Sequence, residues 1–198
     1  MAITLSNRHI PLAAIRDAAT AVYGAAIRTP LVRLEHDGPP GTQIYLKLET
    51  LQPIGSFKIR GAQNTIRQLT PEQLKEGVWT VSAGNAAQGV ALAAKKMGAR
   101  CSVMVIDTAP DTKIRAIERL GATIVRASYD ECWKTVEAHG SGRMAGYFVH
   151  PFDDDRFIAG NATAALSGRA GAGTVVAVVS GGNIDLARFA ALVGACQP

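Results

Sequence analysis

Cysteine, aromatic residues and long apolar runs are all scarce in this sequence. Its three cysteines, Cys101, Cys132 and Cys196, are far apart and form no CxxC pair, which argues against a zinc site or a redox pair. Unpaired cysteines fit a reducing compartment, so we expect a cytoplasmic protein. No apolar run reaches the roughly 18 residues that a membrane helix needs, and the first residues lack the pattern of a signal peptide. These absences argue against a secreted or membrane protein.

Clustered charge is also missing. The formal net charge is +5, but the basic residues are scattered and are not interleaved with aromatic residues, which argues against a nucleic-acid partner. The four histidines show no HxxxH spacing, so we interpret them as surface or loop residues and predict no metal site. What remains is 47% hydrophobic and 19% charged. This composition is typical of an ordinary globular protein of one domain or two small ones.

Strands and helices alternate along most of the chain. The strands are short and apolar, as expected when both faces of a sheet are covered. Alternation of this kind predicts parallel β-sheet and an α/β fold. Ser56 and Thr70 each stand where a helix N-cap is expected, and Gln73 completes a capping box with Thr70. The predicted strands are 42–49, 78–82, 101–106, 123–127, 146–150 and 174–179, and the predicted helices are 11–26, 56–67, 85–97, 110–120, 129–139, 153–166 and 184–193, with a further helix starting at Thr70.

Lys58 is a candidate reactive lysine because apolar residues flank it. Phe57 precedes it and Ile59 follows it, so packing against both is available. Partial desolvation lowers the pKa of an amine and makes its neutral, nucleophilic form accessible. A single lysine at a helix start is nevertheless most often a solvated surface residue. Lys58 therefore needs support from the rest of the sequence.

Two further segments each follow a predicted strand and contain glycine and asparagine. Ser82–Gly89 opens a predicted helix, and the free backbone N–H groups at such a start bind anions such as a carboxylate. Ser180–Asn183 follows the strand 174–179, and the carboxyl ends of strands are where α/β folds place ligands. Taken alone, each segment is more typical of an ordinary tight turn, with Asn85 as a helix N-cap in the first.

Together these segments resemble a known family in both residues and order. The chain resembles the fold-type II enzymes that use pyridoxal 5′-phosphate (PLP), and among them the threonine/serine dehydratase and serine racemase group. The resemblance covers nearly the whole chain and implies a tryptophan synthase β-like, three-layer α/β fold. The segments that carry it are Thr29–Leu31, Lys47–Glu49, Gln52–Ala62, Ser82–Gly89, His150–Asp154 and Ser180–Asn183.

The resemblance implies a role for each matched residue. Lys58 would bind the PLP aldehyde covalently and then move the Cα proton of the substrate. Phe57 would pack near the cofactor ring and Asn85 would hydrogen-bond the ring oxygen. Ser180 would face the pyridine nitrogen and, being neutral, leave it largely unprotonated. The residues expected around the substrate carboxylate are Ser82, Ala83, Gly84 and Gln88.

Ala83 separates the activities within the group. Serine racemases resemble Ser-Ser-Gly-Asn in this loop, and their second serine can serve as the acid or base opposite the lysine, whereas Ala83 has no proton to give. Dehydration needs only one-sided deprotonation. We therefore expect an ammonia-lyase that converts L-threonine, L-serine or a related β-hydroxy amino acid to a 2-keto acid and ammonia. The alternatives are an inactive truncated remnant and a serine racemase-type activity.

The sequence departs from the family in its phosphate site. The family's glycine-rich loop is expected between the His150–Phe152 region and the last strand, but only Gly168–Gly173 lies there, and its arginine and alanines favour a linker. We interpret this as an internal deletion: 1–52 and 151–198 are the two ends of a truncated large domain, and 53–150 is a complete small domain. We expect weakened PLP binding and exposed apolar surface, which favours a homo-oligomer.

Overall fold

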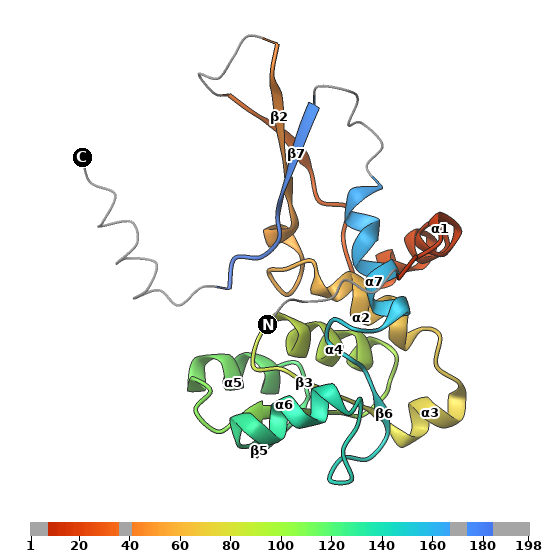
Figure 1. Ribbon diagram of the computed structural model, residues 1–198, viewed down its shortest axis with the longest axis vertical. Coiled ribbons are helices and arrows are strands. Elements are labelled where there is room, and N and C mark those ends of the chain that lie inside the picture. Colours follow the sequence, from red (N-terminus) through yellow and green to blue (C-terminus); the bar gives the residue numbers. More distant parts are fainter. Residues whose placement is uncertain (1–7, 36–40, 167–173, 184–198) are drawn as a thin grey trace, which may run out of the picture.

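The computed structural model describes residues 8–35, 41–166 and 174–183, and in them the chain forms two β-sheets with helices between and around them (Figure 1). The helix expected at 184–193 and the linker expected at Gly168–Gly173 lie outside the described residues. The two sheets lie at opposite ends of the view in Figure 1, with α2 between them. No helix among the described residues is long and apolar enough to cross a membrane.

One sheet has four strands in the order β5-β4-β3-β6, and every pairing in it is parallel. This confirms the expected parallel α/β arrangement. Its core is aliphatic: Val78, Val90 and Val103 are each no more than 2% exposed and belong to one cluster. The strands are β3 (Val78–Val81), β4 (Cys101–Ile106), β5 (Thr123–Ala127) and β6 (Tyr147–Phe148), and the helices around them are α3 (Pro71–Glu76), α4 (Asn85–Lys96), α5 (Asp111–Glu118) and α6 (Tyr129–Glu137).

The other sheet has three strands in the order β1-β2-β7. β2 (Gln43–Leu48) pairs antiparallel with β1 (Leu31–Leu34) and parallel with β7 (Thr174–Val179). Because paired residues of neighbouring strands point to the same face, the register gathers only aliphatic side chains on one face. Three of them, Val32, Leu34 and Val175, are 39–53% exposed in the described structure. The face consists of Val32, Leu34, Ile44, Leu46, Leu48, Val175, Ala177 and Val179.

Three helices join the two sheets, and glycines set how closely they approach. α2 (Lys58–Ile66) packs against both α4 and α7 (Asp155–Ala162). A Cβ on Gly160 of α7 would lie 2.5 Å from the carbonyl oxygen of Arg60, and one on Gly61 would lie 2.7 Å from that of Phe157. On the other side, a Cβ on Gly89 of α4 would lie 3.0 Å from the carbonyl oxygen of Lys58. The first turn of α2 therefore packs closely against the backbone of α7 on one side and of α4 on the other.

A buried ion pair ties α2 to the segment before it. The carboxylate of Glu49, in the short 3₁₀ helix η2 (Glu49–Leu51), accepts from Arg60 Nε at 2.7 Å and from Nη2 at 2.8 Å. Both side chains are fully buried. Thr29 and Gln52 also donate to this carboxylate, at 2.6 and 3.0 Å. Arg60 further donates to Thr163 in the 3₁₀ helix η3 (Thr163–Ala165), so one network joins α2, η2 and η3.

The sequence interpretation differs from the structure at a few element ends. Ser56 is not the N-cap of α2; that position belongs to Phe57, without a side-chain cap, because Ser56 pairs with Gly181 in an isolated β-bridge. β1 was not predicted, and the strand expected at 146–150 shortens to β6. The helix expected at 11–26 divides into α1 (Leu12–Ala21) and a 3₁₀ turn, η1 (Val22–Gly24). The capping box at Thr70 is present as predicted.

Candidate active site

Lys58 is the first residue of α2, and its side chain is half-buried. Its Nζ donates a hydrogen bond to the Pro151 carbonyl oxygen at 3.0 Å. The ring centroids of Phe57 and Phe157 each lie 5.3 Å from Nζ. Burial lowers the pKa of the Lys58 amine, because desolvation disfavours the ammonium form. The nucleophilic neutral form is therefore accessible at a lower pH than in an exposed lysine.

The residues that follow β7 pair with those that precede Lys58. The backbone N–H of Phe57 donates to the carbonyl oxygen of Ser180 at 3.0 Å, and the N–H of Gly182 donates to Gly55 at 3.0 Å. Gly55 has φ +67°, and a Cβ there would lie 2.9 Å from Asn183 Oδ1, so this turn requires glycine on both counts. The hydrogen bond to Phe57 holds Ser180, which is exposed, beside the residue that precedes Lys58.

Asn85, at the start of α4, joins the same cluster. Its Oδ1 accepts from Asn183 Nδ2 at 2.8 Å, and the same Nδ2 donates to the Ile54 carbonyl oxygen at 2.7 Å. With Oδ1 engaged, the Asn85 amide presents its Nδ2 as a donor. Gly181 passes directly beside that nitrogen, because a Cβ there would lie 3.0 Å from it. The structure thus brings Asn85 next to the 180–183 segment, and Asn183 is the group that orients Asn85.

The loop between β3 and α4 carries the other predicted residues. The Ser82 hydroxyl accepts from the N–H of Gly84 at 3.1 Å, which shapes the turn, and Gly84 is the N-cap of α4. The expected alternative of Asn85 as N-cap is therefore wrong. A Cβ on Gly84 would meet nothing within 4 Å, so the loop faces open space. The N–H groups of the first turn of α4 have no intrahelical partner and suit an anion. Ala83 and Gln88 flank this turn and are half-buried.

His150 shapes the turn that presents the Pro151 carbonyl to Lys58. It follows β6, outside the shortened strand that was expected to reach it, and it is buried, with only 3% exposed, although we interpreted it as a surface or loop residue. Its Nδ1 accepts from the N–H groups of Asp153 at 2.8 Å and Phe152 at 3.3 Å, and its Nε2 donates to the Val136 carbonyl oxygen at 3.2 Å. Burial lowers the pKa of His150, which favours this neutral form. His139 and Asp153 bring ligand atoms within 4.8 Å of His150. Both ring nitrogens of His150 are engaged in the hydrogen bonds given above. These hydrogen bonds of the turn explain why His150 lies beside His139 and Asp153.

This geometry agrees with the relationships of the chain. The profile of the family described as pyridoxal-phosphate dependent enzymes matches residues 22–187, and the chain belongs to that family. Its α/β fold is the tryptophan synthase β-like fold of the fold-type II enzymes, as the sequence predicted.

Two curated relatives and one solved structure place it within the family. It is 42% identical over 150 residues to the biosynthetic chloroplastic threonine dehydratase 1 of Solanum lycopersicum, which covers 73% of this chain and 24% of that protein. It is 37% identical over 171 residues to the catabolic L-threonine dehydratase of Staphylococcus aureus, which covers 83% and 49%. The structure of maize serine racemase aligns with a TM-score of 0.70 at 30% identity and covers 80% of this chain and 49% of the other. The chain thus spans half or less of the length of these proteins.

The described residues fit the reactive part of the family's cofactor. Lys58 supplies a desolvated amine, Asn85 a donor, and Ser56 a hydroxyl that is fully buried and has no hydrogen-bond partner in the described structure. Ser56 lies against Gly181, whose Cβ would be 3.1 Å from that of Ser56. Among the described residues, no glycine-rich loop is available to bind the phosphate group of the cofactor. The fit therefore covers the aldehyde and ring end of the cofactor.

Sequence reasoning missed three groups at this site. The Pro151 carbonyl is a backbone group and leaves no trace in residue type. His150 stands within the family-like segment His150–Asp154, and its position before proline at a strand end was the available signal. Asn183 was part of the recognised Ser180–Asn183 segment but had no assigned role. The available signal was its amide side chain, next to two glycines, because such a group can orient a neighbour by hydrogen bonding.

Proposed function

We propose that this chain is a PLP-dependent ammonia-lyase of the threonine/serine dehydratase type. Its substrate would be L-threonine, L-serine or a related β-hydroxy amino acid, and its products a 2-keto acid and ammonia. The observation that carries the proposal is the desolvated Lys58 amine, 3.0 Å from the Pro151 carbonyl oxygen and next to the 180–183 segment. The names of the relatives in tomato and Staphylococcus aureus support the reaction type.

Each proposed role rests on the chain's own residues. When bound, PLP supplies an electron-withdrawing ring that stabilises negative charge at the substrate Cα. Lys58 Nζ would accept the Cα proton, and burial favours the neutral amine that this requires because it lowers the pKa of Lys58. The free N–H groups of the first turn of α4, next to the loop Ser82–Gly84, would hold the substrate carboxylate, and Gln88 lies one turn further along. Asn85 Nδ2 would donate to the ring oxygen, and the Ser180 hydroxyl would face the pyridine nitrogen.

Ala83 favours elimination over racemisation in this proposal. It occupies the loop position where a second acid or base would stand, and a methyl group cannot exchange a proton. Lys58 then acts from one face only. The solved serine racemase structure shares the fold, but Ala83 has no group that could act as an acid or base from the face opposite Lys58.

Two further features belong to the same proposal. Residues 53–150, which hold the parallel sheet, correspond to a small domain, and 1–52 with 151–198 correspond to a large domain that lacks its central part. The aliphatic face of the β1-β2-β7 sheet supports self-association of the chain, which analytical ultracentrifugation measures. We propose a cytoplasmic location, supported by the wide spacing of the three cysteines in the sequence and by the free thiols of Cys101 and Cys132.

The experiment is a PLP titration of the purified chain, followed by visible absorbance, with L-threonine and L-serine turnover measured as 2-keto acid. We expect a new visible band that is lost in Lys58→Ala and kept in Lys95→Ala, an exposed lysine on α4. Keto-acid release without interconversion of serine enantiomers supports the dehydratase. A wild-type chain without a PLP-dependent band would favour the inactive remnant, and enantiomer interconversion without keto acid would favour a racemase.

A further inference from the structure

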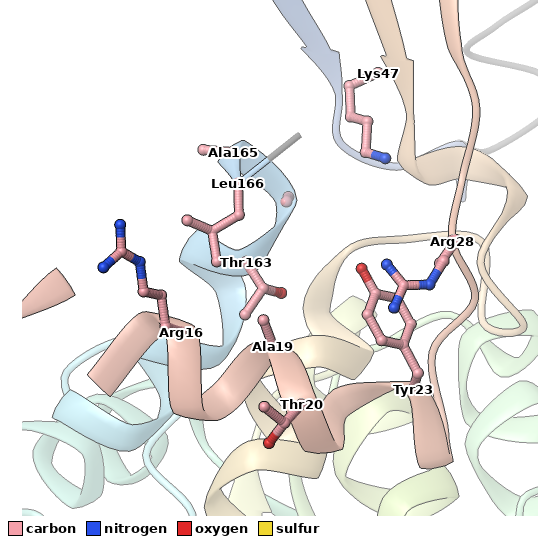
Figure 2. Close-up of a pocket in the computed structure, with 10 residues that line it drawn as sticks. Arg16, Ala19, Thr20, Tyr23, Arg28, Lys47, Thr163, Ala165 and Leu166 are labelled. Atoms are coloured by element: carbon pink, nitrogen blue, oxygen red, sulfur yellow. The ribbon is translucent and has the colours of Figure 1, made fainter. Parts of the chain in front are cut away.

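A cavity separate from the Lys58 site is lined by Lys47 of β2 and by residues of α1 and η3. It has a volume of about 710 Å³ and is formed by α1, η3 and β2, and neither Lys58, Asn85 nor Ser180 lines it. Arg60 connects the two regions, because it donates to Thr163, which lines the cavity. Figure 2 shows the cavity with its residues as sticks. They are Arg16, Ala19, Thr20, Tyr23, Arg28, Lys47, Thr163, Ala164, Ala165 and Leu166.

The charged side chains that line this cavity are all positive. Three lining side chains are cationic and none of the ten is acidic. Lys47 is the buried member, only 8% exposed, and Nζ donates one described hydrogen bond, to the Thr29 carbonyl oxygen at 2.6 Å. An ammonium carries three donors, so two remain for a ligand. Burial lowers the pKa of Lys47, and the positive charges of Arg60 and Arg28 add to this effect while Glu49 opposes it.

Arg28 is oriented toward the same end of the cavity. Its guanidinium lies 4.0 Å from the centre of the Tyr23 ring, a stacking that holds the group in place. In Figure 2 the Lys47 ammonium points toward the end of the cavity where Arg28 lies over Tyr23, while Arg16 stands at the opposite end. The Lys47 ammonium and the planar Arg28 guanidinium thus face the same end of the cavity, which Tyr23 and Thr163 also line.

We propose that this cavity binds a small phosphate-bearing anion, with its phosphoryl group between Lys47 and Arg28. A phosphoryl group offers several oxygens in a tetrahedral arrangement, which takes donors from an ammonium and a guanidinium at once. The volume falls within the range of small-molecule pockets and leaves room for an organic part beside Ala19 and Leu166. An anion there also relieves the repulsion between the buried Lys47 and its two arginine neighbours. The proposal is independent of PLP chemistry at Lys58.

The test is calorimetric titration with inorganic pyrophosphate at constant ionic strength. We expect binding by the wild-type chain and an affinity at least about tenfold weaker in Arg28→Gln, since a charge-assisted hydrogen bond contributes about that factor. Arg119→Gln is the matched control, because it removes an exposed arginine beyond α5 and changes the net charge equally. Circular dichroism verifies that the variants fold.

A second measurement needs no variant. Pyrophosphate should protect Lys47 from reductive methylation, read by mass spectrometry, while the exposed Lys95 reacts at the same rate with or without it. Absence of wild-type binding, equal weakening in Arg28→Gln and Arg119→Gln, or an unprotected Lys47 would overturn the proposal. Equal affinity for malonate would overturn the phosphate assignment, because it would show that any dianion suffices.

Discussion

Replacing Glu49 by glutamine should destabilise the chain more than any exposed substitution. Glu49 is fully buried and accepts two hydrogen bonds from Arg60, one from Thr29 and one from Gln52. Burial acts to raise the pKa of this carboxyl, but the bonds from Arg60 and Thr29 outweigh it and hold the pKa below 4.5. Glu49→Gln removes the charge while the Arg60 guanidinium stays buried, which costs about 3–5 kcal/mol. Small domains have a total stability of roughly 5–15 kcal/mol, so the loss is a large fraction of the whole.

A double-mutant cycle separates the pair from its surroundings. Arg60→Met alone leaves a buried carboxylate, and Glu49→Gln with Arg60→Met leaves neither charge. A buried ion pair and apolar residues of similar volume often contribute about the same stability. The double variant should therefore recover most of the stability that each single variant loses. The coupling energy should then be at least as large as the loss in a single variant, about 3 kcal/mol or more, which is the upper end of the range for residues in contact.

The assay is urea unfolding followed by circular dichroism, with sucrose present so that the weakest variant stays folded. The carboxylate contribution is complete above pH 4.5 and is lost as the pH falls through the depressed folded pKa, so the cycle is run near pH 7 and repeated in acid. A loss in Glu49→Gln below about 1 kcal/mol, the value of an exposed pair, would refute the reasoning. So would a double variant no more stable than either single one.

Three further predictions follow from close contacts and buried titratable groups. Gly160→Ala places a Cβ 2.5 Å from the Arg60 carbonyl oxygen and should cost about 1–3 kcal/mol or more in urea unfolding, whereas Gly142→Ala, with open space around it, should cost less than about 1 kcal/mol. Lys58→Met should be more stable than wild type at pH 7, because burial lowers the Lys58 pKa; the difference should shrink as the pH rises toward 10.5, and a wild-type advantage at pH 7 would contradict this. Wild-type stability should fall as the pH drops below 6.5, where unfolded His150 binds a proton that the folded form resists; His150→Asn should lose that part of the slope, and an unchanged slope would count against it.

The sequence predicted the part of the site that depends on residue type at strand and helix ends. Lys58, Asn85 and Ser180 each stand next to a predicted boundary. Asn85 follows β3 of the parallel sheet, whereas Ser180 follows β7 of the other sheet, so the alternating pattern alone did not place them together. Their common position is visible in the contacts of Phe57 with Ser180 and of Asn85 with Asn183. Their roles toward cofactor and substrate stay predictions.

The parts that sequence reasoning missed depend on tertiary contacts. Ser56 looks like an N-cap in isolation, yet a β-bridge to Gly181 takes its place in the fold. His150 looks like a loop histidine, and only the packing of α6 beside it shows that its ring is buried and bonded to Val136. β1 is short and follows Pro30, so its pairing with β2 carries little local signal. In each case a partner distant in sequence decides the outcome.

That dependence gives the Lys58 site a particular place in the folding sequence. Its pieces come from far apart in the chain: the bond between Asn183 and Ile54 spans 129 positions, and that between Lys58 and Pro151 spans 93. Contacts of such separation carry the largest loop-closure cost and form after local structure. α3, with its capping box, and the β3-α4-β4 unit need no such closure. A reactive Lys58 is therefore a marker of late folding, and its chemistry reports whether the residues around Lys58 have met Pro151 and the segment 180–183.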